Sequence, residues 1–163
     1  MLSIYILTSI HAAMDDIDRK IVELLSADAR RSLADIGSSV DLSPSAVNER
    51  IRRLTSSGAL RRFTVDIDPD AFGFQTLLFV LVALREDAEE GKFRTYAASH
   101  KGVLECHHVT GPWSYLMKVR VEATPDIEIF LADMKNQGGV ARTETIISLS
   151  SPEPGAFILK DQT

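Results

Sequence analysis

The strongest constraint on the fold is a change in the spacing of apolar residues at residues 66–73 of this 163-residue chain. Before this segment, apolar residues recur every three or four positions, as in amphipathic helices. After it, strand-like apolar runs alternate with helical patterns. The segment itself is acidic and contains Pro69 and Gly73, which interrupt regular structure. The change predicts a helical domain followed by a mixed domain, and therefore an α+β protein.

The first half has the pattern of three short helices. Residues 15–27 place apolar side chains on one helix face, and residues 32–40 form a shorter helix capped by Ser32. Ser43 and Pro44 are a strong helix start, because serine caps the backbone and proline is tolerated at the first helical position. A strand-like run follows at residues 59–67. This order predicts a winged helix-turn-helix.

The second half predicts the order βαββαβ, a ferredoxin-like four-stranded antiparallel sheet with both helices on one face. One face of the sheet then has no cover. In the strand at 115–121, Leu116, Lys118 and Arg120 point to that face. An uncovered sheet face usually packs against another copy, so we expect at least a homodimer. The elements are expected at residues 75–84, 86–100, 103–109, 115–121, 126–137 and 142–149.

Charge is unevenly distributed, although the chain carries a net charge of −5. Between Ser43 and Arg62 there are five arginines and one acid, Glu49. A local basic stripe on an acidic protein is typical of a small DNA-reading face. The alternatives are a solvated face that binds a protein partner and, for the last two arginines, ordinary edge-strand charges. The predicted DNA-binding residues are Ser43, Ser45, Asn48, Glu49, Arg52, Arg53, Arg61 and Arg62, whereas Arg50 is expected either to extend along the apolar stripe toward solvent or to pair with an acid.

Other chemistry has little support. No nucleophile with an adjacent base, phosphate loop or dinucleotide motif occurs, so no catalytic residue and no cofactor are predicted. Cys106 and His108 share one strand face and His107 the other, so these three cannot converge on a metal ion without ligands from elsewhere, and no metal site is predicted. The single cysteine favours a reducing, cytoplasmic setting, and no apolar run reaches the about 20 residues of a membrane span.

The turn at residues 110–115 offers more chemistry than a hairpin needs. Gly111 and Pro112 expose backbone groups, Trp113 supplies a rigid apolar wall, and three hydroxyls surround them. These groups suit a small polar ligand, and a tight hairpin with a partly buried tryptophan is the alternative. The alternative function is that of a small dimeric enzyme with a ferredoxin-like fold, a class of enzyme that lacks a winged helix. The candidate effector residues of the turn are Thr110, Gly111, Pro112, Trp113, Ser114 and Tyr115.

Motifs in both halves resemble one family, the Lrp/AsnC feast/famine transcription regulators, from about Asp15 to Ser150. They are Asp16-Ile-Asp-Arg-Lys-Ile-Val-Glu-Leu-Leu25, Ala29-Arg-Arg-Ser32, Val40-Asp-Leu-Ser-Pro-Ser45, Arg50-Ile-Arg-Arg-Leu54, Gly58-Ala-Leu60, Asp68-Pro69, Gly73, Thr110-Gly111, Tyr115-Leu-Met-Lys-Val-Arg-Val121 and Gly139-Val140.

The resemblance implies a DNA-binding domain at residues 14–62, a hinge at 63–74 and a ligand-sensing and oligomerisation domain at 75–150. It implies double-stranded DNA as partner, a homodimer that often assembles into an octamer, and an amino-acid effector. Ser114 stands where the family commonly has an acid. We interpret residues 1–13 as a loose arm or an upstream mis-start, and 151–163 as a tail. Besides the turn, the resemblance places the effector at Thr145, Ile146 and Ile147.

Overall fold

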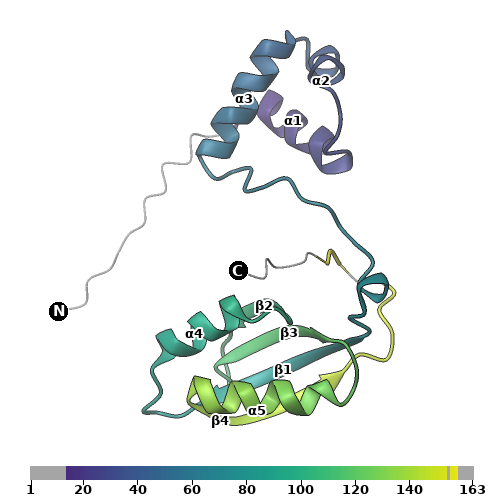
Figure 1. The fold of residues 1–163 in the computed structure, drawn as a ribbon. Helices are drawn as coiled ribbons and strands as arrows, with labels where there is room; N and C mark the ends of the chain where they lie inside the picture. The colour runs from purple at the N-terminus through teal and green to yellow at the C-terminus, as the bar shows by residue number, and fades with distance from the viewer. Residues whose placement is uncertain (1–13, 154, 158–163) are drawn as a thin grey trace, which may run out of the picture. The chain divides into compact units, whose positions relative to one another are not determined.

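The computed structural model describes residues 14–153 and 155–157, so the predicted arm at 1–13 and the end of the tail lie outside it. The chain divides into two compact units, of which the first ends at Thr64 and the second begins at Val65, inside the predicted hinge (Figure 1). The elements are α1 (Asp16–Ala27), α2 (Leu33–Val40), α3 (Pro44–Ser56), the 3-10 turn η1 (Asp70–Phe72), β1 (Thr76–Leu84), α4 (Glu90–Ser99), β2 (Val103–His108), β3 (Tyr115–Val121), α5 (Asp126–Gly138) and β4 (Val140–Ile147).

The first unit is a three-helix helix-turn-helix domain in which every helix begins with a side-chain cap, as predicted for α2 and α3. The side chains of Asp15, Ser32 and Ser43 each accept a hydrogen bond from the third backbone N–H that follows. A side chain on Gly37 would collide with the carbonyl oxygen of Leu42, so glycine is required where α2 meets the turn. The buried core is built around Ile21, Leu25, Ile36 and Val47, and Leu54 of α3 is buried as well.

The predicted wing is wrong. Residues 59–67 form no strand in the described part of the chain, although their sequence alternates as a strand does. Phe63 is 54% and Val65 71% exposed, so neither side chain is buried as the inward-facing residues of a packed strand are. A strand also needs a neighbouring strand for its backbone hydrogen bonds, and no strand among the residues that the structure describes pairs with this segment. The domain is therefore a helix-turn-helix followed by an extended segment.

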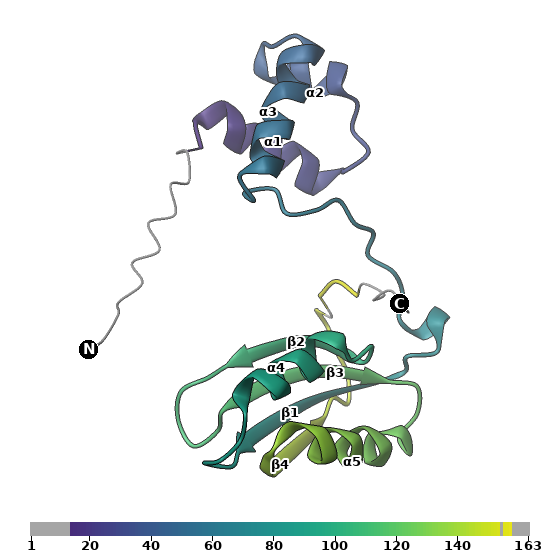
Figure 2. The same cartoon turned by 60° about the vertical axis from the view of Figure 1, so that its left-hand side comes forward.

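The second unit is the predicted antiparallel sheet, with strand order β2-β3-β1-β4. Both helices cover the same face of it (Figure 2). β3 has the predicted bounds, while α4 begins four residues later than residue 86 because the segment before it folds as a turn. β4 begins two residues early and ends two early, and each of the other boundaries agrees with the prediction to within one residue.

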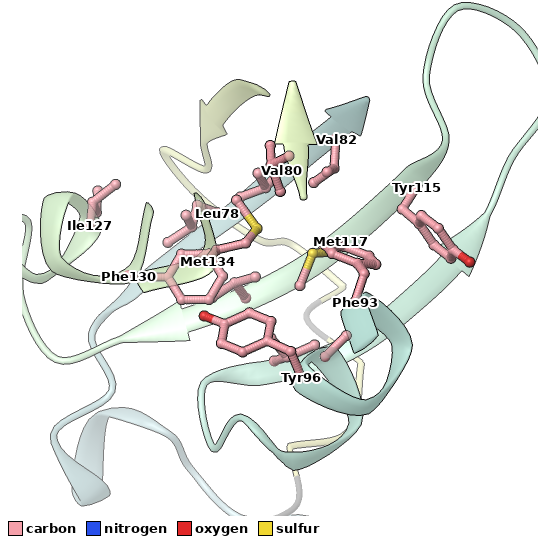
Figure 3. Packing of buried hydrophobic residues seen from close by; sticks show 14 of the residues in the cluster. Leu78, Val80, Val82, Phe93, Tyr96, Tyr115, Met117, Ile127, Phe130 and Met134 are labelled. Carbon is pink, nitrogen blue, oxygen red and sulfur yellow. The ribbon is translucent and has the colours of Figure 1, made fainter. Parts of the chain in front are cut away.

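The core lies between this sheet face and the two helices (Figure 3). Phe93, Tyr96 and Ala97 of α4 point inward, as predicted. Along β3, the predicted alternation is confirmed for Tyr115 and Met117, which pack against the helices. The remaining core side chains include Leu78, Val80, Val82, Val119, Phe130 and Met134.

Part of the opposite face, called here the open face, is covered by the C-terminal segment. Phe157 is 5% exposed, and its ring centroid lies 5.4 Å from that of Phe74. Its backbone N–H donates to Asp66 Oδ1 at 2.7 Å, and its carbonyl accepts from the N–H of Ile67. The tail therefore fastens the end of the hinge to the sensing domain, a contact that the sequence did not predict. None of the described helices has the length and apolar character needed to cross a membrane.

Candidate functional sites

The outer face of α3 presents four of the predicted DNA-binding side chains together. Val47 and Leu54 are buried on the inner face, so residues offset from them along the helix point outward. Ser43 Oγ accepts from the N–H of Ala46 at 3.2 Å, which fixes the start of the helix. The exposed side chains of this outer face are Ser45, Asn48, Glu49 and Arg52.

Arg53 and Arg50 are held by acids of α1. Asp18 is only 2% exposed, and its carboxylate accepts from Arg53 at 2.7 Å and from Arg50 at 2.8 Å. Arg50 also bonds Asp15 at 2.7 Å, and this hydrogen bond lowers the pKa of Asp15. The pairing of Arg50 with an acid is confirmed. Arg53, although half exposed, is directed into the domain by Asp18 rather than held free for DNA.

Arg52 differs from these neighbours because it forms no hydrogen bond or ion pair within the described residues. Its guanidinium keeps a fork of N–H donors that fits a guanine edge or a phosphate. Asn48 beside it has the amide that pairs with adenine. The outer face therefore combines a donor fork, an amide and a hydroxyl on one rigid helix.

Arg61 and Arg62 lie in the extended segment after α3. Both are exposed, and neither takes part in an ion pair among the residues that the structure describes. Because the wing is absent, no strand fixes their direction. They provide positive charge next to the helix-turn-helix without a defined geometry.

The turn between β2 and β3 is closed by contacts to β4. The guanidinium of Arg142 lies 4.1 Å from the ring centroid of Trp113 and donates to the carbonyl of Pro112 at 3.2 Å. Gly111 has φ +102°, a left-handed conformation that only glycine adopts readily. The turn therefore keeps a fixed shape, with Thr110 exposed at its tip.

The last two residues of the turn point into the protein. Ser114 Oγ accepts from the N–H of Leu84 at 3.1 Å, so its hydroxyl is used structurally. Tyr115 is 3% exposed and lies beside Phe93, with its hydroxyl directed away from the centre of the cluster (Figure 3). That hydroxyl donates to Glu90 of α4. Neither hydroxyl is presented at the surface of the turn.

The other predicted effector residues, at the end of β4, lie farther along the sheet. Thr145 pairs with Val80 and Ile147 with Leu78, whereas Tyr115 pairs with Val82. Ile146 and Ile147 are 49% and 45% exposed. The turn and residues 145–147 are therefore not brought together within one chain.

Ionisation of Tyr115 is expected to make the stability of the sensing domain depend on pH in the alkaline range. Burial, and then the hydrogen bond to Glu90, raise the pKa of Tyr115 to about 12. A raised pKa stabilises the fold below the unfolded value of about 10, and this stability is lost as the pH rises from about 10 to about 12.

We therefore expect the unfolding midpoint in urea, followed by the fluorescence of Trp113, to fall more between pH 9 and pH 11 in the wild type than in Tyr115→Phe. Trp113 is the only tryptophan, so its signal reports on the sensing domain. An equal fall in both proteins would contradict the assignment.

No group of three or more His, Cys, Asp or Glu side chains that could hold a metal ion occurs in the described part of the chain. As predicted from strand alternation, Cys106 and His108 pair with residues of the helix-covered face and His107 with Leu116 of the open face. His107 lies 3.2 Å from Glu105.

Comparison with known proteins places both halves in one family. The AsnC-type helix-turn-helix domain matches residues 14–55, and the Lrp/AsnC ligand binding domain matches residues 77–156. The HTH-type transcriptional regulator FL11 of Pyrococcus horikoshii is 33% identical over 141 residues, which cover 85% of this chain and 91% of the relative.

Two solved structures agree with this placement. The crystal structure of the Mycobacterium tuberculosis leucine response regulatory protein LrpA has a TM-score of 0.78 at 33% identity, covering 85% of this chain and 94% of that one. The feast or famine regulatory protein of M. tuberculosis complexed with L-methionine has a TM-score of 0.80 at 32% identity, covering 86% and 95%. The relatives are regulators, which excludes the enzyme alternative. Both domains, in the predicted order and with the predicted sheet, show that this chain belongs to the Lrp/AsnC family of DNA-binding transcription regulators.

Proposed function

We propose that this regulator recognises a specific duplex sequence through the outer face of α3 and that a small-molecule effector tunes this binding. The observation that carries the proposal is the difference between neighbouring arginines: Asp18 holds Arg50 and Arg53, while Arg52 keeps all its donors. The guanidinium of Arg52 thus offers free N–H donors on a rigid helix, and an extended basic segment follows that helix. This arrangement suits readout of base edges in the major groove. Ser43, Ser45, Asn48 and Glu49 complete the surface, and Arg61 and Arg62 add backbone attraction.

The effector of this chain is proposed to be an amino acid or a related metabolite. A related regulator of M. tuberculosis was solved in complex with L-methionine. In this chain, Thr110, Gly111 and Pro112 form the exposed part of the turn beside the half-buried Trp113, and Ser114 replaces a carboxylate that would hold an amino group more strongly. Thr145, Ile146 and Ile147 belong to such a site only if a second chain supplies one of the two parts, because a single chain keeps them apart.

The open face supports a homodimer, which is the unit from which an octamer would be built. Phe79 and Leu81 of β1 are only partly buried there, as is Leu116, and Ile146 of β4 is 49% exposed. Apolar side chains of this kind gain about 25 cal/mol per Å² when a second copy covers them. A protein that reads DNA shares a compartment with it, so we place this regulator in the cytoplasm.

The proposal is tested by titrating a labelled duplex from upstream of the gene for this protein and reading anisotropy at about 50 and 200 mM salt. We expect preference for this duplex over an unrelated one, and affinity that falls steeply with salt as counterions are released. Equal binding to both duplexes, with and without an amino-acid mixture, would contradict sequence-specific recognition. Binding of a protein partner with little salt dependence and no DNA binding would favour the interaction-module alternative.

A further inference from the structure

A cavity of about 300 Å³ lies at the end of the sheet opposite the turn at residues 110–115. β3 begins beside that turn at Tyr115 and ends at Val121, and the cavity is lined by residues from this far end. Its volume is at the lower limit of ligand pockets, which suits a ligand of amino-acid size. None of the residues assigned above to DNA or effector lines it.

One wall is a single face of α5. Asp126, Ile129, Phe130 and Asp133 follow the spacing i, i+3, i+4, i+7 and all line the cavity. Phe130 is buried in the core, whereas Ile129 is 68% exposed. The wall thus has an acid at each end and apolar side chains between them.

The rest of the lining carries the two cationic side chains, Arg120 and Lys101, together with one further acid, Glu122. Arg120, which is only 9% exposed, donates one hydrogen bond to the carbonyl of Phe74 at 2.8 Å, and the carboxylate of Asp70 lies 4.0 Å away. A guanidinium has five N–H donors, so this bond leaves others available. Lys101 is exposed and forms no ion pair among the described residues.

We propose that this cavity is a second ligand site, which takes a small zwitterion with an apolar side chain. The carboxylate lies against Arg120 and Lys101, the ammonium group against the acids of α5, and the side chain against Phe74 and Phe130. The choice of an amino acid as ligand rests on the proposed function, but the site does not depend on DNA binding.

The cavity also touches the point where the hinge enters the sheet. Phe74 is its second aromatic wall, and the ring of Phe157, which fastens the hinge, packs against Phe74. Arg120 contacts both, because its guanidinium carbon lies 5.9 Å from the ring centroid of Phe157. A bound carboxylate therefore meets the same arginine that holds the start of β1 and the tail.

Isothermal titration of the full chain with L-methionine tests the site. Two analogues that each lack one charge, 4-(methylthio)butanoate and 3-(methylthio)propylamine, serve as probes of the two walls. We expect L-methionine to bind and each analogue to bind at least tenfold more weakly. Lys101→Glu and Ile129→Trp should each weaken L-methionine binding at least tenfold, by reversing the charge and by filling the cavity from an exposed position.

The matched controls lie outside the cavity. Lys135→Glu changes an exposed lysine of α5, and Leu33→Trp adds a tryptophan at an exposed leucine of α2; both should bind L-methionine as the wild type does. If Lys101→Glu and Ile129→Trp both keep the wild-type affinity for L-methionine, the proposal is overturned. A loss of L-methionine binding in Trp113→Ala would in that case assign the ligand to the turn at residues 110–115. Absence of binding by L-methionine, L-leucine and L-phenylalanine would also overturn it, while the duplex titration would still decide DNA recognition.

Discussion

Arg52→Ala is expected to weaken binding to the specific duplex by about 1–3 kcal/mol, which corresponds to about 5- to 150-fold. Arg52 is exposed and, within the described residues, has no partner that would compete with DNA. If its guanidinium neutralises a phosphate, the slope of log affinity against log salt should also fall by about one. Anisotropy titrations at several salt concentrations measure both quantities.

The matched control is Arg94→Ala, which removes an exposed arginine of α4 in the sensing domain. We expect it to leave affinity and salt slope unchanged, because α4 belongs to the other compact unit. Wild-type affinity and slope in Arg52→Ala would count against α3 as the DNA-reading helix.

Replacing both Arg50 and Arg53 by glutamine is expected to destabilise the helix-turn-helix domain by about 3 kcal/mol. The carboxylate of Asp18, whose side chain is 3% exposed, would lose both of its guanidinium partners while remaining buried. We expect the lower end of the usual range because Arg53 is half exposed and its interaction is screened by water. Urea unfolding followed by far-ultraviolet circular dichroism measures the loss.

Two further variants separate this cause from general disruption. Adding Asp18→Asn to the double variant should recover most of the lost stability, because an amide carries no charge to leave unpaired. Arg52→Gln, on the same helix but directed outward, should change the free energy of unfolding by less than about 0.5 kcal/mol. A triple variant that is as unstable as the double variant would contradict the buried-charge account.

Local signals account for much of the fold. Ser43 and Pro44 fixed the start of α3 without any knowledge of tertiary structure, since the cap and the first helical position depend on adjacent residues. The bounds of β3 followed from alternation between Tyr115 and Val121. The start of α4 was missed because residues 86–89 are good helix formers, yet the helix begins at Glu90 with no side-chain cap.

The predictions that failed or stayed incomplete involve residues distant in the sequence. The run at 59–67 has the alternation of a strand, but no strand of the described residues pairs with it. Helical spacing leaves both Arg52 and Arg53 outside the apolar stripe of α3, and only the packing of α1 against α3 brings Asp18 to one of them. The contact of Arg142 with Trp113 depends on β4 lying beside β1 and close to the turn.

The cavity beside α5 could not be predicted from the sequence for the same reason. The helical periodicity of α5 predicts which residues share a face, but the opposite wall comes from residues 101 and 120, which are not adjacent in the sequence. Strand alternation correctly predicts that Arg120 lies on the open face. Its burial under Phe157 could not be predicted, because no sequence motif pointed to a contact by the C-terminal segment.

The central claim is that the outer face of α3 reads bases, and the most direct measurement is selection of preferred duplexes from a random pool by the wild type and by Asn48→Ala. The alanine variant should lose its preference at one base position in each half-site and keep the salt slope of the wild type, because an uncharged amide contributes to readout and not to phosphate attraction. The same preferred sequence from both proteins, at every position, would contradict base readout by this face.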